Sequence, residues 1–201
     1  MSFKQYWARQ FSNPTGYGGK IATFIMNRFN GANYDAVISC APKNGDILDI
    51  GFGNGCLIKR LAGKRDAAIY GVDISKDMVK LATKRNKKAI KNNRIILTEG
   101  ASDNIPYDKR FDFIYTVNTV YFWKDLNKGL LEIRNRLKDG GVFMNVLFTK
   151  EFLDKHSYTR YGFTKYTPEE LLKATTDAGY IAEIIEIEKG KSFYVMALVK
   201  S

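Results

Sequence analysis

The stretch Asp49-Ile50-Gly51-Phe52-Gly53-Asn54-Gly55 carries three glycines at alternate positions, directly after a short apolar run. That run, residues 47–50, is typical of a buried strand, and residues 57–61 are typical of a helix. Glycine permits a tight turn between strand and helix, and it lets a ligand approach the backbone closely. This pattern predicts the nucleoside-binding loop of a Rossmann-type fold.

An acidic residue after the next strand supports a nucleoside ligand. Asp73 follows the predicted strand 67–72, where a carboxylate can accept hydrogen bonds from both hydroxyls of a ribose. Dinucleotide-binding loops need a third glycine where this chain has Cys56. The spacing therefore favours an adenosine ligand without a pyrophosphate, and Asp49 is positioned to neutralise an ammonium group directly or through water.

Strands and helices alternate over the rest of the chain. Further strands are predicted at residues 95–97, 111–117 and 142–148, and helices at 34–40, from Lys76 onward and at 126–137. Near-continuous apolar strands are typical of a parallel sheet covered on both faces. The helix at 126–137 is expected to stop at an Asp139-Gly140-Gly141 turn.

The last third of the chain departs from this alternation. Thr167 precedes Pro168 and lies three residues before Glu170, a pattern that predicts a helix start. Two strands are predicted at residues 181–188 and 193–200, and a connection this short permits only an antiparallel pair.

In order and spacing, these segments resemble class I S-adenosylmethionine-dependent methyltransferases, and in particular a small bacterial-type subgroup. The matching segments are residues 46–55 (motif I), 71–75 (motif II), 99–102 (adenine-flanking), 111–118 (motif IV) and 131–141, with 13–19 and 120–123 matching the subgroup. The resemblance implies an α/β, three-layer Rossmann-like fold. Its seven-stranded, mostly parallel sheet has the order 3-2-1-4-5-7-6, with strand seven antiparallel.

The resemblance also implies S-adenosyl-L-methionine as cofactor and S-adenosyl-L-homocysteine as product. Asp73 is expected to hold the ribose, and Ile74 to lie against the adenine. The full set of expected cofactor-binding residues is Asp49, Gly51, Phe52, Gly53, Asp73, Ile74, Met78, Ala101, Ser102 and Asn118.

The acceptor should enter where the strand order reverses, near the ends of strands one and four. Tyr121 and Trp123 follow strand four and are expected to contact an acceptor, although core packing is the alternative. Tyr158, after strand five, is a third expected acceptor contact. His156 is a candidate general base, with a surface histidine as the alternative, and Tyr17 is expected to close over the site.

Composition limits the class of protein. The chain has 201 residues, 45% of them hydrophobic, and it contains no run long enough to span a bilayer and no signal peptide, so a cytoplasmic location is expected. We expect an N-terminal helical cap over residues 1–42 and a cofactor-binding domain over 43–201. Cys40 and Cys56 are expected to be free thiols, and no metal-binding pattern is present.

The net charge of +11 favours acidic partners. The densest basic stretch, residues 80–91, is interpreted as the solvated face of an amphipathic helix, with a nucleic-acid patch as the alternative. The favoured function is methyl transfer to a small molecule by a monomer or homodimer. The alternatives are an RNA or protein methyltransferase, a nucleotide-binding oxidoreductase and a non-catalytic cofactor-binding protein.

Overall fold

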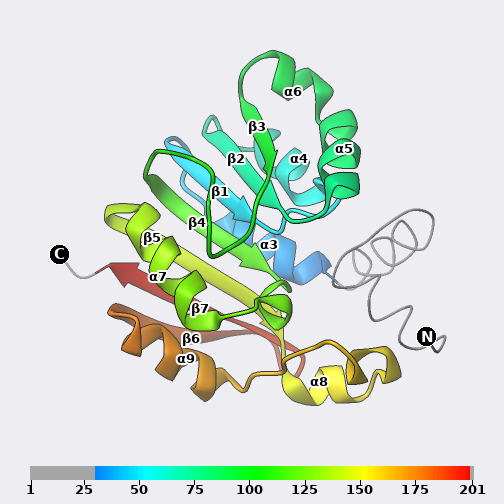
Figure 1. Cartoon of the computed structure of the whole chain (residues 1–201), viewed down its shortest axis with the longest axis vertical. Coiled ribbons are helices and arrows are strands. Elements are labelled where there is room, and N and C mark those ends of the chain that lie inside the picture. The colour runs from blue at the N-terminus through cyan, green and yellow to red at the C-terminus, as the bar shows by residue number, and fades with distance from the viewer. Residues whose placement is uncertain (1–29, 200–201) are drawn as a thin grey trace.

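The computed structural model describes residues 30–199, which form one seven-stranded sheet with helices on both faces (Figure 1). The strands are β1 (Asp46–Ile50), β2 (Ala68–Asp73), β3 (Ile95–Glu99), β4 (Phe111–Val117), β5 (Leu137–Phe148), β6 (Tyr180–Glu188) and β7 (Ser192–Val199). Their order is β3-β2-β1-β4-β5-β7-β6. The first five strands run parallel, and β7 pairs antiparallel with both β5 and β6. The predicted topology is therefore confirmed.

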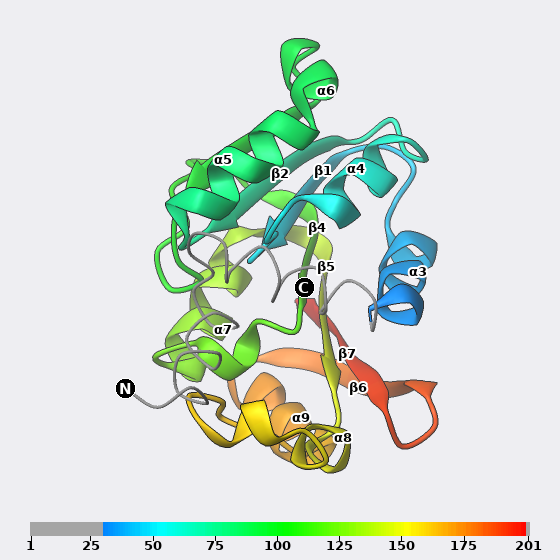
Figure 2. The same cartoon turned by 90° about the vertical axis from the view of Figure 1, so that its right-hand side faces the viewer.

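The helices form two outer layers (Figure 2). They are α3 (Gly31–Cys40), α4 (Cys56–Ala62), α5 (Lys76–Arg85), α6 (Lys87–Lys91), α7 (Leu126–Arg136), α8 (Lys150–Asp154) and α9 (Pro168–Asp177), with short 3-10 turns η1 (Val120–Phe122) and η2 (Ser157–Arg160). Buried residues of α3, α4 and α5 share one apolar cluster with the central strands. Residues of α7 share a second cluster on the other face.

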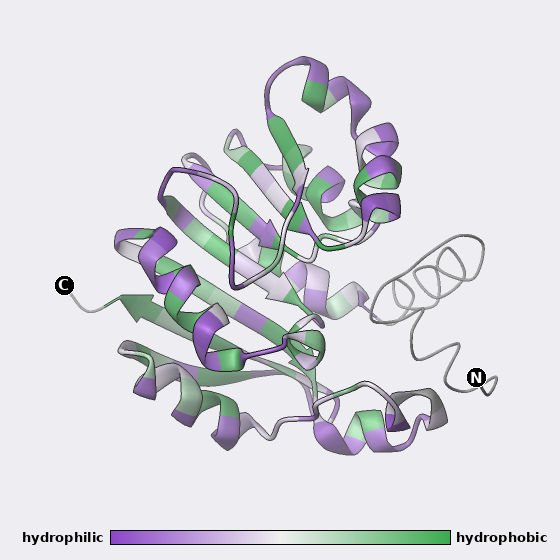
Figure 3. Cartoon of the chain, in the orientation of Figure 1, coloured by the Kyte–Doolittle hydropathy of each residue, from purple (hydrophilic) through white to green (hydrophobic). Residues whose placement is uncertain are grey.

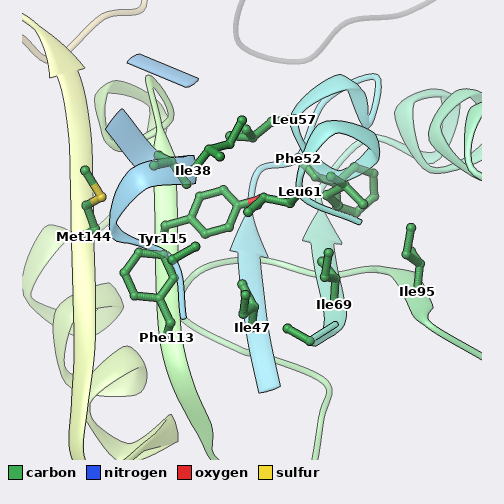
Figure 4. Close-up of a cluster of buried hydrophobic side chains, with 14 of the residues drawn as sticks. Ile38, Ile47, Phe52, Leu57, Leu61, Ile69, Ile95, Phe113, Tyr115 and Met144 are labelled. Atoms are coloured by element: carbon green, nitrogen blue, oxygen red, sulfur yellow. The ribbon is translucent and has the colours of Figure 1, made fainter. Parts of the chain in front are cut away.

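The core explains why these segments fold together. Figure 4 shows Ile38 of α3 and Leu61 of α4 directed toward Phe113 and Tyr115 of β4, and all four side chains are buried. Hydrophobic residues concentrate in the strands, whereas α5 and α6 carry mostly hydrophilic ones (Figure 3). Because α3 packs in this core, residues 31–40 belong to the helical layer. The rest of the cap predicted over residues 1–42 lies mostly at residues 1–29, outside the described residues.

The basic segment is two helices and not one. Asn86 separates α5 from α6, and its side-chain Nδ2 donates to the carbonyl oxygens of Ala82 and Gly55, at 2.9 and 3.1 Å. A side chain that bonds back to the preceding turn competes with helix continuation. The tie to Gly55 also joins the end of α5 to the glycine loop.

Helix α7 ends at Arg136, and β5 already begins at Leu137, so the predicted turn at 139–141 lies inside the strand and not before it. The strand starts irregularly, because its pairing with β4 passes from Leu137 to Val142. Gly140 has a φ of 70°, and a Cβ at Gly141 would lie 2.8 Å from the Lys138 carbonyl oxygen. The two glycines thus permit the chain to turn within this irregular start of β5.

The predicted start of α9 is confirmed. Thr167 accepts a hydrogen bond from the Glu170 amide, and Glu170 in return accepts from the Thr167 amide, forming a capping box. No helix among residues 30–199 combines the length and apolar character needed to cross a bilayer.

Candidate cofactor-binding site

A cavity of about 200 Å³ opens at the carboxyl ends of the central strands. Ile50, Asp73 and Val117, the last residues of β1, β2 and β4, all line it. Strand order reverses between β1 and β4, and open α/β sheets bind ligands at such a switch point. Further lining residues are Asn30, Tyr34, Gly51, Phe52, Gly53, Asn54, Ile74, Met78, Gly100, Ala101, Ser102, Asp103, Asn118, Thr119, Phe122, Trp123 and Lys124.

The glycine loop connects β1 to α4 with three left-handed residues, Gly51, Gly53 and Gly55, at φ of 76°, 54° and 70°. A side chain at Gly51 would collide with Thr119, and one at Gly55 would lie 2.7 Å from Ala82. A side chain at Gly53 would meet no atom of residues 30–199 within 4 Å. Gly53 thus leaves open space beside its backbone on the cavity wall, which a ligand can occupy.

Asp73 is fixed by the backbone of two loops. Its Oδ2 accepts from the Gly53 amide and its Oδ1 from the Ser75 amide, both at 2.8 Å. Burial raises the pKa of Asp73 to about 6, although these two hydrogen bonds act in the opposite direction. Each carboxylate oxygen accepts more than one hydrogen bond, so both can still accept from a vicinal diol. This geometry fits the predicted ribose contact.

Asp49 lies behind the cavity wall and does not line it, which corrects the expectation of a direct ligand contact. It is 3% exposed, and its Oδ2 accepts from the Tyr115 hydroxyl at 2.7 Å. Burial raises the pKa of Asp49 to about 8. The carboxyl can therefore influence a cationic ligand by charge or through water, but the Tyr115 bond holds it inside the core.

The base-binding end gathers residues from three predicted motifs. Ile74, Met78, Ala101 and Ser102 line the same cavity, and Ile74 is 54% exposed although it is apolar. An exposed isoleucine in a cavity offers an apolar surface to a flat base. These residues and Asp73 together fit an adenosine.

Sequence reasoning missed Asn30 and Tyr34, which line the opposite end of the cavity. Asn118 Nδ2 donates to Asn30 Oδ1 at 2.9 Å, and Asn118 Oδ1 accepts from the Phe148 amide at 3.1 Å. The Asn118 side chain is therefore engaged with protein groups, although the residue lines the cavity as predicted. No motif signals Asn30, because its partner lies 88 residues away in the sequence.

The predicted acceptor and catalytic residues are only partly brought together. Trp123 lines the cavity. Tyr121 does not: it is 2% exposed in an apolar cluster, with its hydroxyl 3.1 Å from Asn118 Oδ1, so the expectation that it faces the pocket is wrong.

His156 does not line the cavity either, because it follows α8, where its Nδ1 lies 2.9 Å from the Phe152 carbonyl oxygen and its ring packs on Phe152. Tyr17 and the Tyr158 side chain lie outside what the structure describes.

Comparison with known proteins agrees with this geometry. Residues 48–145 match the family model described as a methyltransferase domain. An uncharacterized methyltransferase, YdaC, of Bacillus subtilis is 34% identical over 125 residues, which cover 60% of this chain and 67% of the relative.

A ubiquinone/menaquinone biosynthesis C-methyltransferase of Geotalea daltonii is 32% identical over 136 residues, 65% of this chain and 57% of the relative. Among solved structures, a putative methyltransferase in complex with the Haloferax volcanii Trm112 methyltransferase activator superposes with a TM-score of 0.78 at 18% identity, covering 100% of this chain and 99% of that one. The chain therefore belongs to the class I methyltransferases, enzymes that use S-adenosylmethionine as the methyl donor.

Proposed function

We propose that this enzyme transfers the methyl group to a small-molecule acceptor. The observation that carries the proposal is the cavity itself. Beyond the residues assigned below to the cofactor, Phe122 and Lys124 also line it, within a total of about 200 Å³. A confined site of this kind suits a small molecule better than a polymer chain.

S-adenosylmethionine, when bound, would supply a methyl group on a sulfonium: a nucleophile of the acceptor would bond to the methyl carbon in line as the carbon–sulfur bond breaks and S-adenosylhomocysteine leaves. The residues of this chain then have three tasks: they hold the adenosine, orient the amino acid end and exclude water. We assign the ribose to Asp73 and the base to Ile74, Met78, Ala101 and Ser102. We assign the amino acid end to the glycine loop and to Asn30, Tyr34 and Asn118, which would hold it.

Charge supports this placement. Asp49 and Asp73 are both buried, and neither forms an ion pair with a residue that the structure describes. Buried carboxylates without a cation are costly. A ligand that carries a sulfonium and an ammonium supplies the missing positive charge.

The acceptor end favours an apolar or aromatic molecule. Phe122 lines the cavity, and its ring packs edge-on against Phe163 at 4.6 Å between centroids. Among the described lining residues only Tyr34, Asp73, Asp103 and Lys124 have ionisable side chains, and Asp73 is assigned to the ribose. We favour an acceptor whose nucleophile needs no general base from this chain. A catalytic role of Tyr17 stays a prediction, and His156 is no longer favoured.

The test is a product-release assay. Purified protein and S-adenosylmethionine are incubated with a cell extract divided by ultrafiltration into small molecules and macromolecules, and S-adenosylhomocysteine is measured. We expect release with the small-molecule fraction, and much slower release with the Asp73→Asn variant at a cofactor concentration that does not saturate it. Release with the macromolecular fraction alone would contradict the proposal.

A macromolecular acceptor is the second candidate, favoured by the charge of α5 and α6. Residues 76–91 hold seven Lys and Arg residues and one Asp, a net +6 within a chain of +11. Lys80, Lys84, Lys87, Lys88 and Lys91 are exposed, and α6 projects beyond the end of α5 (Figure 2). A gel shift with bulk RNA that persists at physiological salt would favour this candidate.

A further inference from the structure

Gly129 lies in the interior of α7, where glycine weakens a helix. A side chain there would meet the indole of Trp123, with the built Cβ 2.7 Å from Cε3 and 2.9 Å from Cζ3. The same Cβ would lie 3.4 Å from Ser102 Oγ. The missing side chain thus gives Trp123 room against the helix, next to the loop that follows β3.

The opposite edge of the indole is also fixed. Trp123 Nε1 donates to Thr119 Oγ1 at 3.2 Å. Thr119 is itself held by a hydrogen bond between its hydroxyl and that of Thr116, and its methyl group fills the space beside Gly51. The ring therefore lies between Gly129 of α7 and Thr119, and Thr119 in turn packs beside Gly51 of the glycine loop.

This position is at the base-binding end of the cavity. Ser102 approaches Gly129 as Trp123 does, and Ala101 and Ile74 line the same cavity. An aromatic ring and an exposed isoleucine offer a flat purine two apolar surfaces. Trp123 also packs against the apolar cluster around Tyr121, whereas the neighbouring Phe122 directs its ring at Phe163.

We propose that Trp123 is a wall of the purine subsite and not of the acceptor site, and that Gly129 is the positioning residue that makes room for it. The proposal rests on the assignment of the ribose to Asp73. Trp123 then selects for the base of the cofactor, while Gly129 acts only through Trp123.

Fluorescence gives a direct test, because the chain has two tryptophans, Trp7 and Trp123. In a full-length Trp7→Phe variant, we expect adenosine to change the emission of Trp123, and L-methionine to leave it unchanged. Replacing Trp123 with Leu should weaken adenosine binding about tenfold by calorimetry, the typical loss of a base–aromatic contact. Trp123→Phe should retain most of the affinity.

The positioning role has a matched control. Gly129→Ala should shift the indole, alter the emission of Trp123 before any ligand is added, and weaken adenosine binding several-fold. Gly31→Ala adds a methyl group to a helical glycine where no described residue lies within 4 Å, and it should do none of these.

The failures are distinguishable. If the unchanged protein binds neither adenosine nor S-adenosylmethionine, the ribose placement itself falls. If adenosine binds but leaves Trp123 emission unchanged, or Trp123→Leu binds it normally, only the purine-wall proposal is overturned. The emission test needs only the Trp7→Phe chain, so it stands even if Trp123→Leu fails to fold.

Discussion

Strand β1 carries an aspartate at each end, and the two have opposite surroundings. Asp46, at the amino end, receives Lys109 Nζ at 2.7 Å and Lys138 Nζ at 3.3 Å. Asp49, near the carboxyl end, is buried against the Tyr115 hydroxyl and has no ion pair with any residue between 30 and 199. Lysines of the protein neutralise the carboxylate at the amino end, whereas the carboxyl group at the other end has no cationic partner among the described residues.

The same contrast extends to neighbouring strands. Burial alone would raise the pKa of Asp112, but the Asp46 amide and Lys138 outweigh it and hold that pKa below its usual value. At the carboxyl ends of the strands the effect of burial is larger than that of the hydrogen bonds, and the pKa values of Asp49 and Asp73 rise to about 8 and about 6. Carboxylates satisfied by lysine stabilise the fold, whereas those left without a cation mark the site of a cationic ligand.

The largest expected effect on ligand binding is on the affinity for the cofactor. Asp73→Asn keeps the size of the side chain, but it removes the charge and turns an NH₂ group toward one of the two amides that Asp73 accepts from. Loss of charge-assisted hydrogen bonds of this kind is worth about 1.5–3 kcal/mol. Calorimetry should therefore show S-adenosylmethionine binding weakened by roughly one to two orders of magnitude.

The control for this prediction is Asp112→Asn, near the amino end of β4. It should leave the cofactor affinity unchanged. Equal loss of affinity in both variants would contradict the claim that only the carboxyl ends of the strands bind the cofactor.

The next effect is a dependence of stability on pH. Burial raises the pKa of Asp49 from 3.8 to about 8, so the folded state binds more protons than the unfolded state in that window. The free energy of unfolding of the ligand-free protein should then fall as pH rises from about 4 to about 8, by about 1.4 kcal/mol for each unit of the pKa shift, on the order of 5 kcal/mol in all. Urea denaturation at a series of pH values measures it.

Asp49→Asn sharpens the pH prediction, because Asn can still accept from Tyr115 but cannot ionise. The fall in stability above pH 6 should largely disappear in this variant. A slope identical to that of the unchanged protein would show that Asp49 is not its source.

A smaller effect, on the free energy of unfolding, is expected at the amino end of β1. Asp46→Asn breaks the ion pairs with Lys109 and Lys138, which are partly exposed. The loss should be about 1 kcal/mol of unfolding free energy. Thermal denaturation should show it, while cofactor binding stays normal; an effect on binding would mean that the two ends of β1 are not independent.

The smallest effect concerns the bond between Asn30 and Asn118. Asn118→Asp removes the donor and should weaken S-adenosylmethionine binding a few-fold, as expected for one neutral hydrogen bond. Asn30→Asp keeps an acceptor for Asn118 Nδ2 and should weaken binding less than Asn118→Asp does. Both variants should bind 5′-methylthioadenosine, which lacks the amino acid end, as the unchanged protein does.

The parts that could be predicted from the sequence are those carried by local patterns. The glycine loop, Asp73 and the order of the strands follow from short motifs at fixed spacing. Asn30 and Tyr34 could not be found this way, because only the packing of α3 brings them to the cavity. Tyr121 and Trp123 both follow β4, and no pattern shows that η1 turns the first into the core and leaves the second on the cavity wall.

The contact between Gly51 and Thr119 has a consequence for how this enzyme can change. The threonine methyl group occupies the place of a side chain at position 51, so the two positions are geometrically complementary. Shortening residue 119 would not by itself admit a larger residue at 51, whose φ of 76° still disfavours one. In an engineered variant of this enzyme, the glycine loop and the segment after β4 should therefore be replaced together.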